Sequence, residues 1–421
     1  MKISKIQAYE ILASGGYPTI EAYIELEDGS SATASVPYGA SAGSHEATVM
    51  TDDDKARWNG KGMQKALSNI KDVLAPALLG FDAYDQRGVD ELMLKLDGTE
   101  NKAKLGGNAI LALSIAVANA AASSKKVELY RHIIDTFQTG VDLKTLPQPM
   151  VVAIEGGKHA DETTDLQEFC FSASRKASVV ENVRMIMECY HALAKVLKKN
   201  KLSTNVGNEG AFAPNGIPSN EAPFSYMLEA IELAGYKPGE EVGFSIDAAA
   251  SEFYKNGKYE LAVEKRTLTA DELIAYYETW FTKYPINTFE DGLHEDDWEN
   301  WTKLKVVTDK YGIPLIGDDL TVTNPIRLQK AIDQNAISAI LIKLNQIGTL
   351  TETVDCCLLA KKHGLMTTTS HRGGGETNDA TMVDVAVAVG SAFIKVGPTR
   401  GERVSKYNRL MAIERQLSNE S

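Results

Sequence analysis

Six ionisable residues in the C-terminal part of the chain each end a short β-prone run. They are Asp247, Glu290, Asp318, Lys343, His371 and Lys395. The gaps between successive members are 43, 28, 25, 28 and 24 residues, about the length of a strand plus a crossover helix. Because only a closed sheet brings six parallel strand ends around one centre, the spacing predicts a (β/α) barrel whose C-terminal edge carries the chemistry.

The strand before Lys343 is the most apolar of the set. Residues 339–342 read A-I-L-I, which is typical of a strand buried on both faces. A charged lysine at the end of such a strand is costly to desolvate unless acidic groups lie close to it. We therefore expect Lys343 to face the carboxylates of the neighbouring strand ends.

The N-terminal part predicts strands followed by a small-residue loop. Residues 3–36 alternate in the β manner, and the pair Asp28-Gly29 between two β-prone runs is a strong hairpin signal. The glycine-rich residues 37–46 are too polar for a core. They form either a plain connection or a mobile loop that closes over a site.

Helices follow these strands. Apolar residues have helical spacing at 61–79, 84–96 and 108–122, and residues 136–149 are predicted to be a linker. We therefore expect an α+β cap domain at 1–135 and a barrel domain at 140–421 that carries the catalytic residues.

Composition excludes some partners. The chain has 44 basic and 57 acidic residues, a formal net charge of −13, which argues against nucleic-acid or anionic-membrane binding. Its four cysteines have no metal or redox spacing, which indicates a reducing compartment. Without a signal-like start or a run of 18 apolar residues, we expect no membrane span and a cytoplasmic protein, while a surface or secreted pool stays open.

Three of the strand-end residues predict a metal site. Asp247, Glu290 and Asp318 offer carboxylate oxygens from three separate strands, which is the ligation that Mg²⁺ prefers. Nothing nearby supplies the His or Cys set expected for zinc. Three acids packed together without a cation would also raise one another's pKa.

Two lysines and two glutamates predict acid–base chemistry. Lys343 and Lys395 lie close to each other in the predicted barrel mouth, so we expect a lowered pKa that would make one of them a general base for a proton next to a carboxylate. Glu168 and Glu209 are candidate acids on the far side. Arg372 has the planar fork that binds phosphate.

These residues lie in motifs that resemble those of the enolase (phosphopyruvate hydratase) family over nearly the whole chain. The motifs are L-D-G-T-E-N-K, H-A-D, Q-E-F, G-N-E-G, S-E-F-Y-K-N-G-K-Y, E-D-G-L, D-D-L-T-V-T-N-P, L-I-K-L-N-Q-I-G-T-L-T-E-T, S-H-R and K-Y-N-R-L. The resemblance implies an α/β fold, a (β/α)8-type barrel of the enolase kind with an antiparallel strand early in the barrel and an N-terminal α+β cap.

The resemblance also implies a reaction and roles. The reaction is the Mg²⁺-dependent reversible dehydration of 2-phospho-D-glycerate to phosphoenolpyruvate in glycolysis and gluconeogenesis. Lys343 would remove the proton from carbon 2, Glu209 would protonate the departing hydroxyl, Glu168 would support Glu209, and His159 would touch the substrate.

The same resemblance implies the remaining contacts. Gln167, Lys343, His371, Arg372, Gly373 and Lys395 would bind the substrate, with Arg372 on its phosphate and Lys395 on its carboxylate side. Asp247, Glu290 and Asp318 would hold one Mg²⁺, and Ser41 would complete a second site. A homodimer or larger homo-oligomer is also implied.

Several positions depart from the family pattern. Gly15 stands in place of an arginine, Tyr38 in place of a serine, Glu155 in place of an asparagine, Asn208 in place of an aspartate, and residues 373–375 are three glycines. We expect the glycine run to add backbone freedom beside the phosphate site and to weaken substrate binding, while the loss of the arginine removes a subunit contact. Two interpretations therefore stay open: a working enolase, and an enolase-like protein with weakened catalysis or an altered substrate, retained for binding a partner or surface ligand.

Overall fold

The computed structural model describes residues 1–39, 43–174 and 177–420. It begins with an antiparallel sheet in the order β1–β2–β3. The strands are β1 (Ile3–Leu12), β2 (Pro18–Leu26) and β3 (Ser31–Ser35). The predicted hairpin lies between β2 and β3, where Gly29 has a φ of 82° and donates its N–H to the Leu26 carbonyl. Glycine suits this turn because other residues are strained at positive φ.

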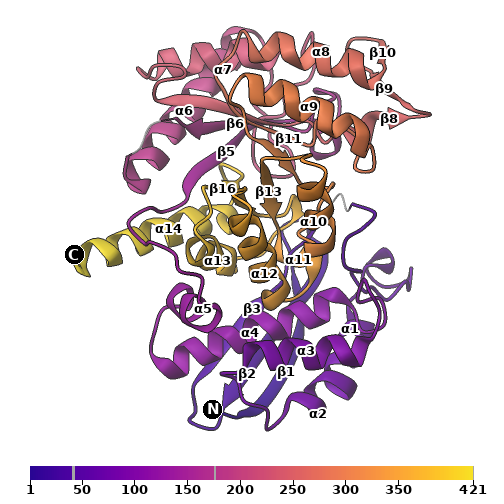
Figure 1. The fold of residues 1–421 in the computed structure, drawn as a ribbon, viewed down its shortest axis with the longest axis vertical. Coiled ribbons are helices and arrows are strands. Elements are labelled where there is room, and N and C mark those ends of the chain that lie inside the picture. Colours follow the sequence, from indigo (N-terminus) through magenta and orange to yellow (C-terminus); the bar gives the residue numbers. More distant parts are fainter. Residues whose placement is uncertain (40–42, 175–176, 421) are drawn as a thin grey trace.

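Helices cover one side of this sheet (Figure 1). They are η1 (Trp58–Gly60), α1 (Gln64–Asn69), the π-helical η2 (Ile70–Leu74), α2 (Ala75–Leu78), α3 (Gln86–Asp97), α4 (Gly107–Lys125) and α5 (Leu129–Phe137). The alanine-rich α4 packs against β2 and β3. By length and composition α4 resembles a membrane span, but 83% of that stretch is buried within the protein, as in a core helix.

A closed barrel of eight strands follows, in the order β11–β12–β13–β14–β16–β5–β6–β7. The strands are β5 (Gln148–Glu155), β6 (Glu168–Ala173), β7 (Val242–Asp247), β11 (Ile286–Glu290), β12 (Leu315–Gly317), β13 (Ala339–Ile342), β14 (Met366–Ser370) and β16 (Phe393–Val396). The strand β6 runs antiparallel to both β5 and β7, and the other neighbouring pairs are parallel. The predicted α/β barrel with a cap, including its early antiparallel strand, is confirmed.

Helices surround the barrel, and short strands join the loops. The helices are η3 (Gly157–His159), α6 (Val179–Lys199), α7 (Ala222–Leu233), η4 (Ala250–Phe253), α8 (Ala270–Phe281), α9 (Trp298–Lys310), α10 (Pro325–Asp333), α11 (Leu344–Ile347), α12 (Leu350–Lys362), α13 (Thr381–Val389) and α14 (Gly401–Glu420). The short strands are β4 (Tyr38–Gly39), β8 (Tyr254–Lys255), β9 (Lys258–Leu261), β10 (Arg266–Leu268) and β15 (Gly374–Gly375). The segment predicted as a linker at 136–149 is shorter than expected, because α5 continues to Phe137 and β5 begins at Gln148.

Capping side chains determine where several barrel helices start. Thr269 and Glu272 form a reciprocal capping box at α8, and the Asn324 side chain accepts backbone N–H groups at the start of α10. Ser178 and Thr349 cap α6 and α12 in the same way. Each of these contacts satisfies backbone donors that a helix leaves unpaired at its first turn.

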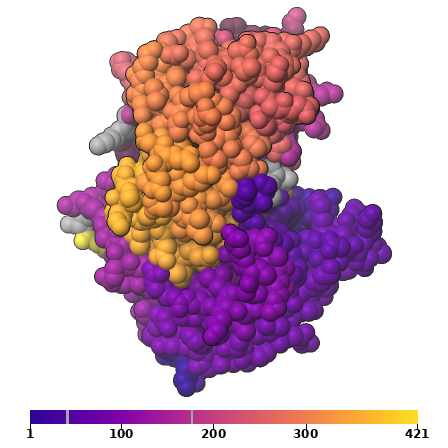
Figure 2. All heavy atoms as spheres, turned by 45° about the vertical axis from the view of Figure 1, so that its right-hand side comes forward, coloured from indigo at the N-terminus to yellow at the C-terminus, as the bar shows by residue number. Residues whose placement is uncertain are grey.

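The cap lies against the barrel at one end of the molecule (Figures 1 and 2). Strand β4 of the N-terminal part pairs antiparallel with β15 of the barrel, so that Gly39 faces Gly374 and Tyr38 faces Gly375. Buried backbone groups at the start of α12 are also bound by the cap, because Leu350 N–H donates to Ser114 and Thr351 N–H donates to Asp90. The two domains therefore share hydrogen bonds across their boundary.

Three departures from the family pattern meet in this contact. A Cβ on Gly15 would lie 2.3 Å from the Gly374 carbonyl oxygen, and a Cβ on Gly375 would lie 2.4 Å from the Tyr38 carbonyl oxygen. Ser14 N–H donates to the Glu376 carbonyl at 2.8 Å. Gly374 and Gly375 are held by backbone pairing with β4, and a side chain at Gly375 would have no space beside Tyr38, while the expected freedom at Gly373 stays a prediction.

We expect Gly15→Ala to lower the free energy of unfolding by about 1–3 kcal/mol, because its methyl group overlaps a backbone oxygen that cannot rotate away. Urea unfolding measures the change. Gly401→Ala is the matched control, since a Cβ there meets open space. Equal stability of the two variants would contradict this packing.

Candidate active site

The predicted strand-end residues lie at one edge of the barrel. Asp247 and Glu290 end β7 and β11 and face each other in register, Asp318 follows β12, and Lys343 follows β13. His371 directly follows β14, and Lys395 lies within β16. Glu168 is the first residue of β6, but because that strand runs antiparallel, it lies at the same edge and in register with Asp247.

Lys395 lies at the centre of the carboxylates and is 2% exposed. Its Nζ is 2.8 Å from Glu168 Oε2, 2.8 Å from Glu290 Oε1 and 3.1 Å from Asp247 Oδ2. Burial alone would lower the pKa of Lys395, but these carboxylates outweigh burial and hold it well above its ordinary value. Lys395 is therefore enclosed by three carboxylates beneath the site.

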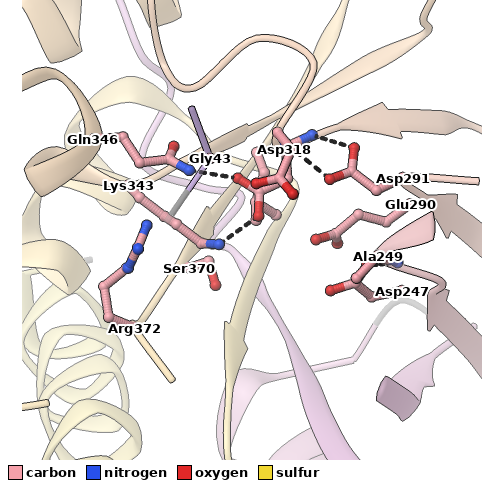
Figure 3. Close-up of polar contacts among 12 residues, drawn as sticks. Gly43, Asp247, Ala249, Glu290, Asp291, Asp318, Lys343, Gln346, Ser370 and Arg372 are labelled. Carbon is pink, nitrogen blue, oxygen red and sulfur yellow. Dashed lines mark hydrogen bonds and ion pairs between the residues drawn. The ribbon is translucent and has the colours of Figure 1, made fainter. Parts of the chain in front are cut away.

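Lys343 forms an ion pair with Asp318 (Figure 3). The other oxygen of Asp318 accepts a hydrogen bond from Gln346 Nε2 at 2.8 Å. Figure 3 shows Lys343 and Gln346 reaching Asp318 from one side, with Asp247 and Glu290 on the other. The predicted contact between Lys343 and the acidic strand ends is therefore present.

The predicted lowering of both lysine pKa values is not observed. Burial lowers the pKa of Lys343 and Arg372 and Lys395 add to this effect, but Asp318 outweighs them and the net direction is upward. The reason is that each ammonium group forms a direct ion pair with a carboxylate: Lys343 with Asp318, and Lys395 with Glu168, Asp247 and Glu290. The ion pair with Asp318 is therefore the contact that raises the pKa of Lys343.

A second cluster contains Glu168, Glu209 and two histidines. His159 Nδ1 is 3.4 Å from Glu168 Oε1 and 3.5 Å from Glu209 Oε1, and His371 Nε2 is 3.1 Å from Glu209 Oε2. Burial and the charge of Glu209 raise the pKa of Glu168 well above its ordinary value. Burial would also raise the pKa of Glu209, but His371 and His159 outweigh it and lower that pKa. Neighbouring carboxyls with separated pKa values are typical of an acid–base site.

The predicted phosphate-binding residues lie between the two clusters and the cap. Arg372 is 3% exposed, and its Nη1 lies 3.0 Å from Glu46 Oε1 of the N-terminal part. Gly373 lies directly on the acid cluster, since a Cβ there would be 2.7 Å from Glu209 Oε1 and 2.8 Å from the His159 ring. The buried Gln167 amide oxygen has no hydrogen-bond partner within the described part of the chain.

One cavity brings most of the predicted residues together. Its wall includes His159, Gln167, Glu168, Glu209, Asp247, Asp318, Lys343, His371, Arg372 and Gly373. Glu290 and Lys395, although predicted for the site, are not part of this wall. Ser41 lies outside the described residues.

Sequence reasoning missed three residues that position the predicted ones. The Asp291 carboxylate accepts the N–H groups of Asp318 at 2.9 Å and Asp319 at 2.8 Å. Gln346 binds Asp318, and Glu46 binds Arg372. A signal existed only for Gln346, which lies three residues after Lys343, on the short helix α11 that directly follows the strand end.

The carboxylates of this edge fit a hard divalent cation. Burial and the charge of Asp247 raise the pKa of Glu290 well above its ordinary value, so the lysines do not fully compensate the acids. Asp318 also lies in a carboxylate group with Asp291 and Asp319, whose oxygens are within 4.8 Å of one another. An all-oxygen donor set with excess negative charge is what Mg²⁺ binds.

Two family models match the chain. The first, described as the enolase N-terminal domain, covers residues 3–133, and the second, described as the enolase C-terminal TIM barrel domain, covers residues 143–421. Together they span nearly the whole sequence and correspond in order to the two parts of the fold.

We expect Mg²⁺ to raise the melting temperature, because it would bind the folded carboxylates and not the unfolded chain. Asp318→Ala should abolish that rise, since it removes one ligand oxygen pair. Thermal unfolding with and without MgCl₂ measures both. Asp333→Asn, an exposed aspartate on α10, is the control and should keep the full rise. An equal rise in Asp318→Ala would refute the metal assignment.

Proposed function

Since the chain belongs to the enolase family, we propose that it catalyses the reversible dehydration of 2-phospho-D-glycerate to phosphoenolpyruvate. The family consists of lyases that bind a phosphorylated substrate and normally use Mg²⁺. The observation that carries the proposal is the placement of a lysine and a glutamate cluster on opposite walls of one cavity. Lys343 follows β13, and Glu168 opens β6, which lies four positions away in the ring of eight strands.

The placement of Lys343 and the glutamate cluster on opposite walls of the cavity suits an elimination reaction. Lys343 Nζ takes the proton from carbon 2 on one face of the substrate, while Glu209 delivers a proton to the carbon-3 hydroxyl on the other face. The proton that Glu209 delivers is held within the group Glu168, His159 and Glu209, whose polar atoms lie within 4.8 Å of one another. Base and acid therefore act without competing for the same proton.

The proposed metal would prepare the base. The Asp318 carboxylate would be one of its ligands, and the metal would supply positive charge to the site. With Asp318 engaged in this way, Lys343 would lose the ion pair that raises its pKa and could accept a proton. Asp247 and Glu290 complete the donor set, and Asp291 and Gln346 keep Asp318 in position.

The remaining residues bind the substrate. Arg372 has a charged planar fork that fits a phosphate, and in this structure Glu46 occupies it. Gln167 offers an unpaired amide oxygen at the cavity wall. Lys395 acts as a fixed counter-charge beneath Asp247 and Glu290, and so supports the carboxylate end from below the cavity wall.

Three further parts of the proposal depend on family membership. We propose a role in glycolysis and gluconeogenesis, a cytoplasmic location, and self-association into a homodimer or larger assembly. The four cysteines are free and buried, which agrees with a reducing compartment.

The main test is conversion of 2-phosphoglycerate, followed as phosphoenolpyruvate formation with and without Mg²⁺. Lys343→Ala should lower the rate by on the order of 10³-fold or more and should also abolish exchange of the carbon-2 hydrogen with deuterated solvent. Glu209→Gln should lose turnover but keep that exchange, because proton removal precedes loss of the hydroxyl. Lys362→Ala, an exposed lysine at the end of α12, is the control.

Carbon-2 exchange at the normal rate in Lys343→Ala would assign the base to another residue. Wild-type protein that binds Mg²⁺ but forms no phosphoenolpyruvate would favour the enolase-like protein with an altered substrate.

Gly373→Ala should lower kcat/KM by on the order of 100-fold, because its methyl group would displace Glu209 and His159 by a fraction of an ångström to an ångström. Turnover assays and a thermal scan measure activity and folding separately. Gly401→Ala again serves as the control. Unchanged activity in Gly373→Ala would show that the acid cluster tolerates a side chain at this position.

A further inference from the structure

A buried carboxyl that the proposed reaction does not use lies directly behind Glu209. Glu155 ends β5 and is 0% exposed. Its two oxygens lie 3.0 and 3.2 Å from the Glu209 backbone N, and one of them also accepts the Ala211 N–H at 3.0 Å. Glu155 is therefore bonded to the backbone of the loop that carries the proposed acid.

The fit between Glu155 and this loop is close. A Cβ on Gly207 would lie 2.6 Å from Glu155 Cδ, so only glycine allows the contact. Other residues hold the loop through its carbonyl oxygens: Tyr190 and Thr399 donate to Gly210 at 2.9 and 2.8 Å. Glu155 supplies acceptors for the loop N–H groups, and the loop cannot shift without breaking both sets of bonds.

Four titratable or charged groups face Glu155. Glu209 lies on the loop, Glu168 is its register partner on β6, and Arg403 and Tyr190 face it from α14 and α6. Burial and the charge of Glu209 raise the pKa of Glu155 to about 8, against its two backbone hydrogen bonds and Arg403. Glu155 therefore changes charge within the range where an enzyme of neutral pH works.

This chain carries the acidic residue at an unusual position. The enolase motifs that this chain resembles have asparagine at 155 and aspartate at 208, whereas this chain has Glu155 and Asn208. The formal charge is the same, but it has moved from the partly exposed position 208 to the fully buried position 155. A charge acts more strongly in a low dielectric, so an ionised Glu155, bonded to the Glu209 backbone at 3.0 Å, would act strongly on Glu209.

We propose that Glu155 is a positioning residue for Glu209, and that its negative charge at alkaline pH keeps a proton within the acid cluster. This inference rests on the proposed function, in which Glu209 must deliver a proton. Below about pH 8 Glu155 is neutral and only holds the loop. Above it, the second negative charge raises the proton affinity of Glu209, so the acid stays competent at higher pH.

The first test needs no substrate. The folded protein keeps the Glu155 proton up to about pH 8, whereas the unfolded chain loses it near 4.5, so the stability of the wild type falls as pH rises between these values. Glu155→Gln removes this dependence. We expect the melting temperature of Glu155→Gln minus that of the wild type to increase as the pH is raised from about 5 to about 9. If this difference stays constant with pH, Glu155 does not titrate as proposed.

The second test is the pH profile of kcat/KM for 2-phosphoglycerate. At high pH, we expect kcat/KM of Glu155→Gln to begin its decline about one pH unit lower than kcat/KM of the wild type. The double variant Glu155→Asn with Asn208→Asp returns the charge to the exposed position and should give an intermediate limb. If the wild type and Glu155→Gln lose kcat/KM at the same alkaline pH, or if the variant is weaker by the same factor at every pH, the proposed electrostatic role of Glu155 is wrong.

The two tests separate this inference from the proposed function. A wild type that forms no phosphoenolpyruvate would refute the proposed reaction, while the melting-temperature comparison would still decide whether Glu155 titrates. The double variant with Glu155→Asn shortens a buried side chain and could fail to fold. In that case both measurements are made on Glu155→Gln, because glutamine has the same side-chain length as glutamate and keeps one acceptor oxygen.

Discussion

Two lysine side chains form ion pairs with the carboxylates that the barrel buries at its C-terminal edge. Lys395 contacts Glu168, Asp247 and Glu290 together, and Lys343 pairs with Asp318. Isolated buried charges cost several kcal/mol each, so removing one partner would destabilise the others. The pKa of Glu290 nevertheless stays raised, because two ammonium groups do not balance all the nearby acids. This residual negative charge suits the proposed binding of Mg²⁺, and a bound cation would in turn release Lys343 from its ion pair.

The cap contributes to the same site through its contacts with the residues that follow β14. Glu46 pairs with Arg372, and β4 pairs with β15 just beyond Arg372. Gly15 lies against the Gly374 carbonyl oxygen with no room for a side chain. The loss of the arginine and the gain of glycines therefore belong to one packing arrangement, in which backbone lies on backbone. This arrangement also places Gly373 against Glu209, so the position of the cap and the geometry of the acid cluster are connected.

In the acid cluster, the effect of a carboxylate depends on whether it lies at the buried position 155 or at the partly exposed position 208. Asn208 and Glu155 together carry the same single charge as the family's asparagine and aspartate, but Glu155 is fully buried and bonded to the Glu209 loop. Burial makes Glu155 hold its proton to about pH 8, and the same burial makes its charge strong once the proton is lost. In the proposed role, the single residue Glu155 thus links the position of the loop to the proton affinity of Glu209.

The sequence by itself determined the barrel, the cap and most of the candidate site. Strand and helix lengths repeat locally, so the spacing from Asp247 to Lys395 was enough to predict that Asp318 and Lys343 share one edge. Only the tertiary structure decided which groups pair. The pKa of Lys343 is raised and not lowered, because Asp318 is closer to it than Lys395 is, and Asp291, Glu46 and Glu155 act through contacts with residues that are mostly distant in the chain. The pairing of Gly374 and Gly375 with β4 likewise joins segments that are far apart in the chain. Spacing along the chain encodes periodic local structure, whereas charge pairing and steric fit depend on distances of a few ångströms that only the folded chain sets.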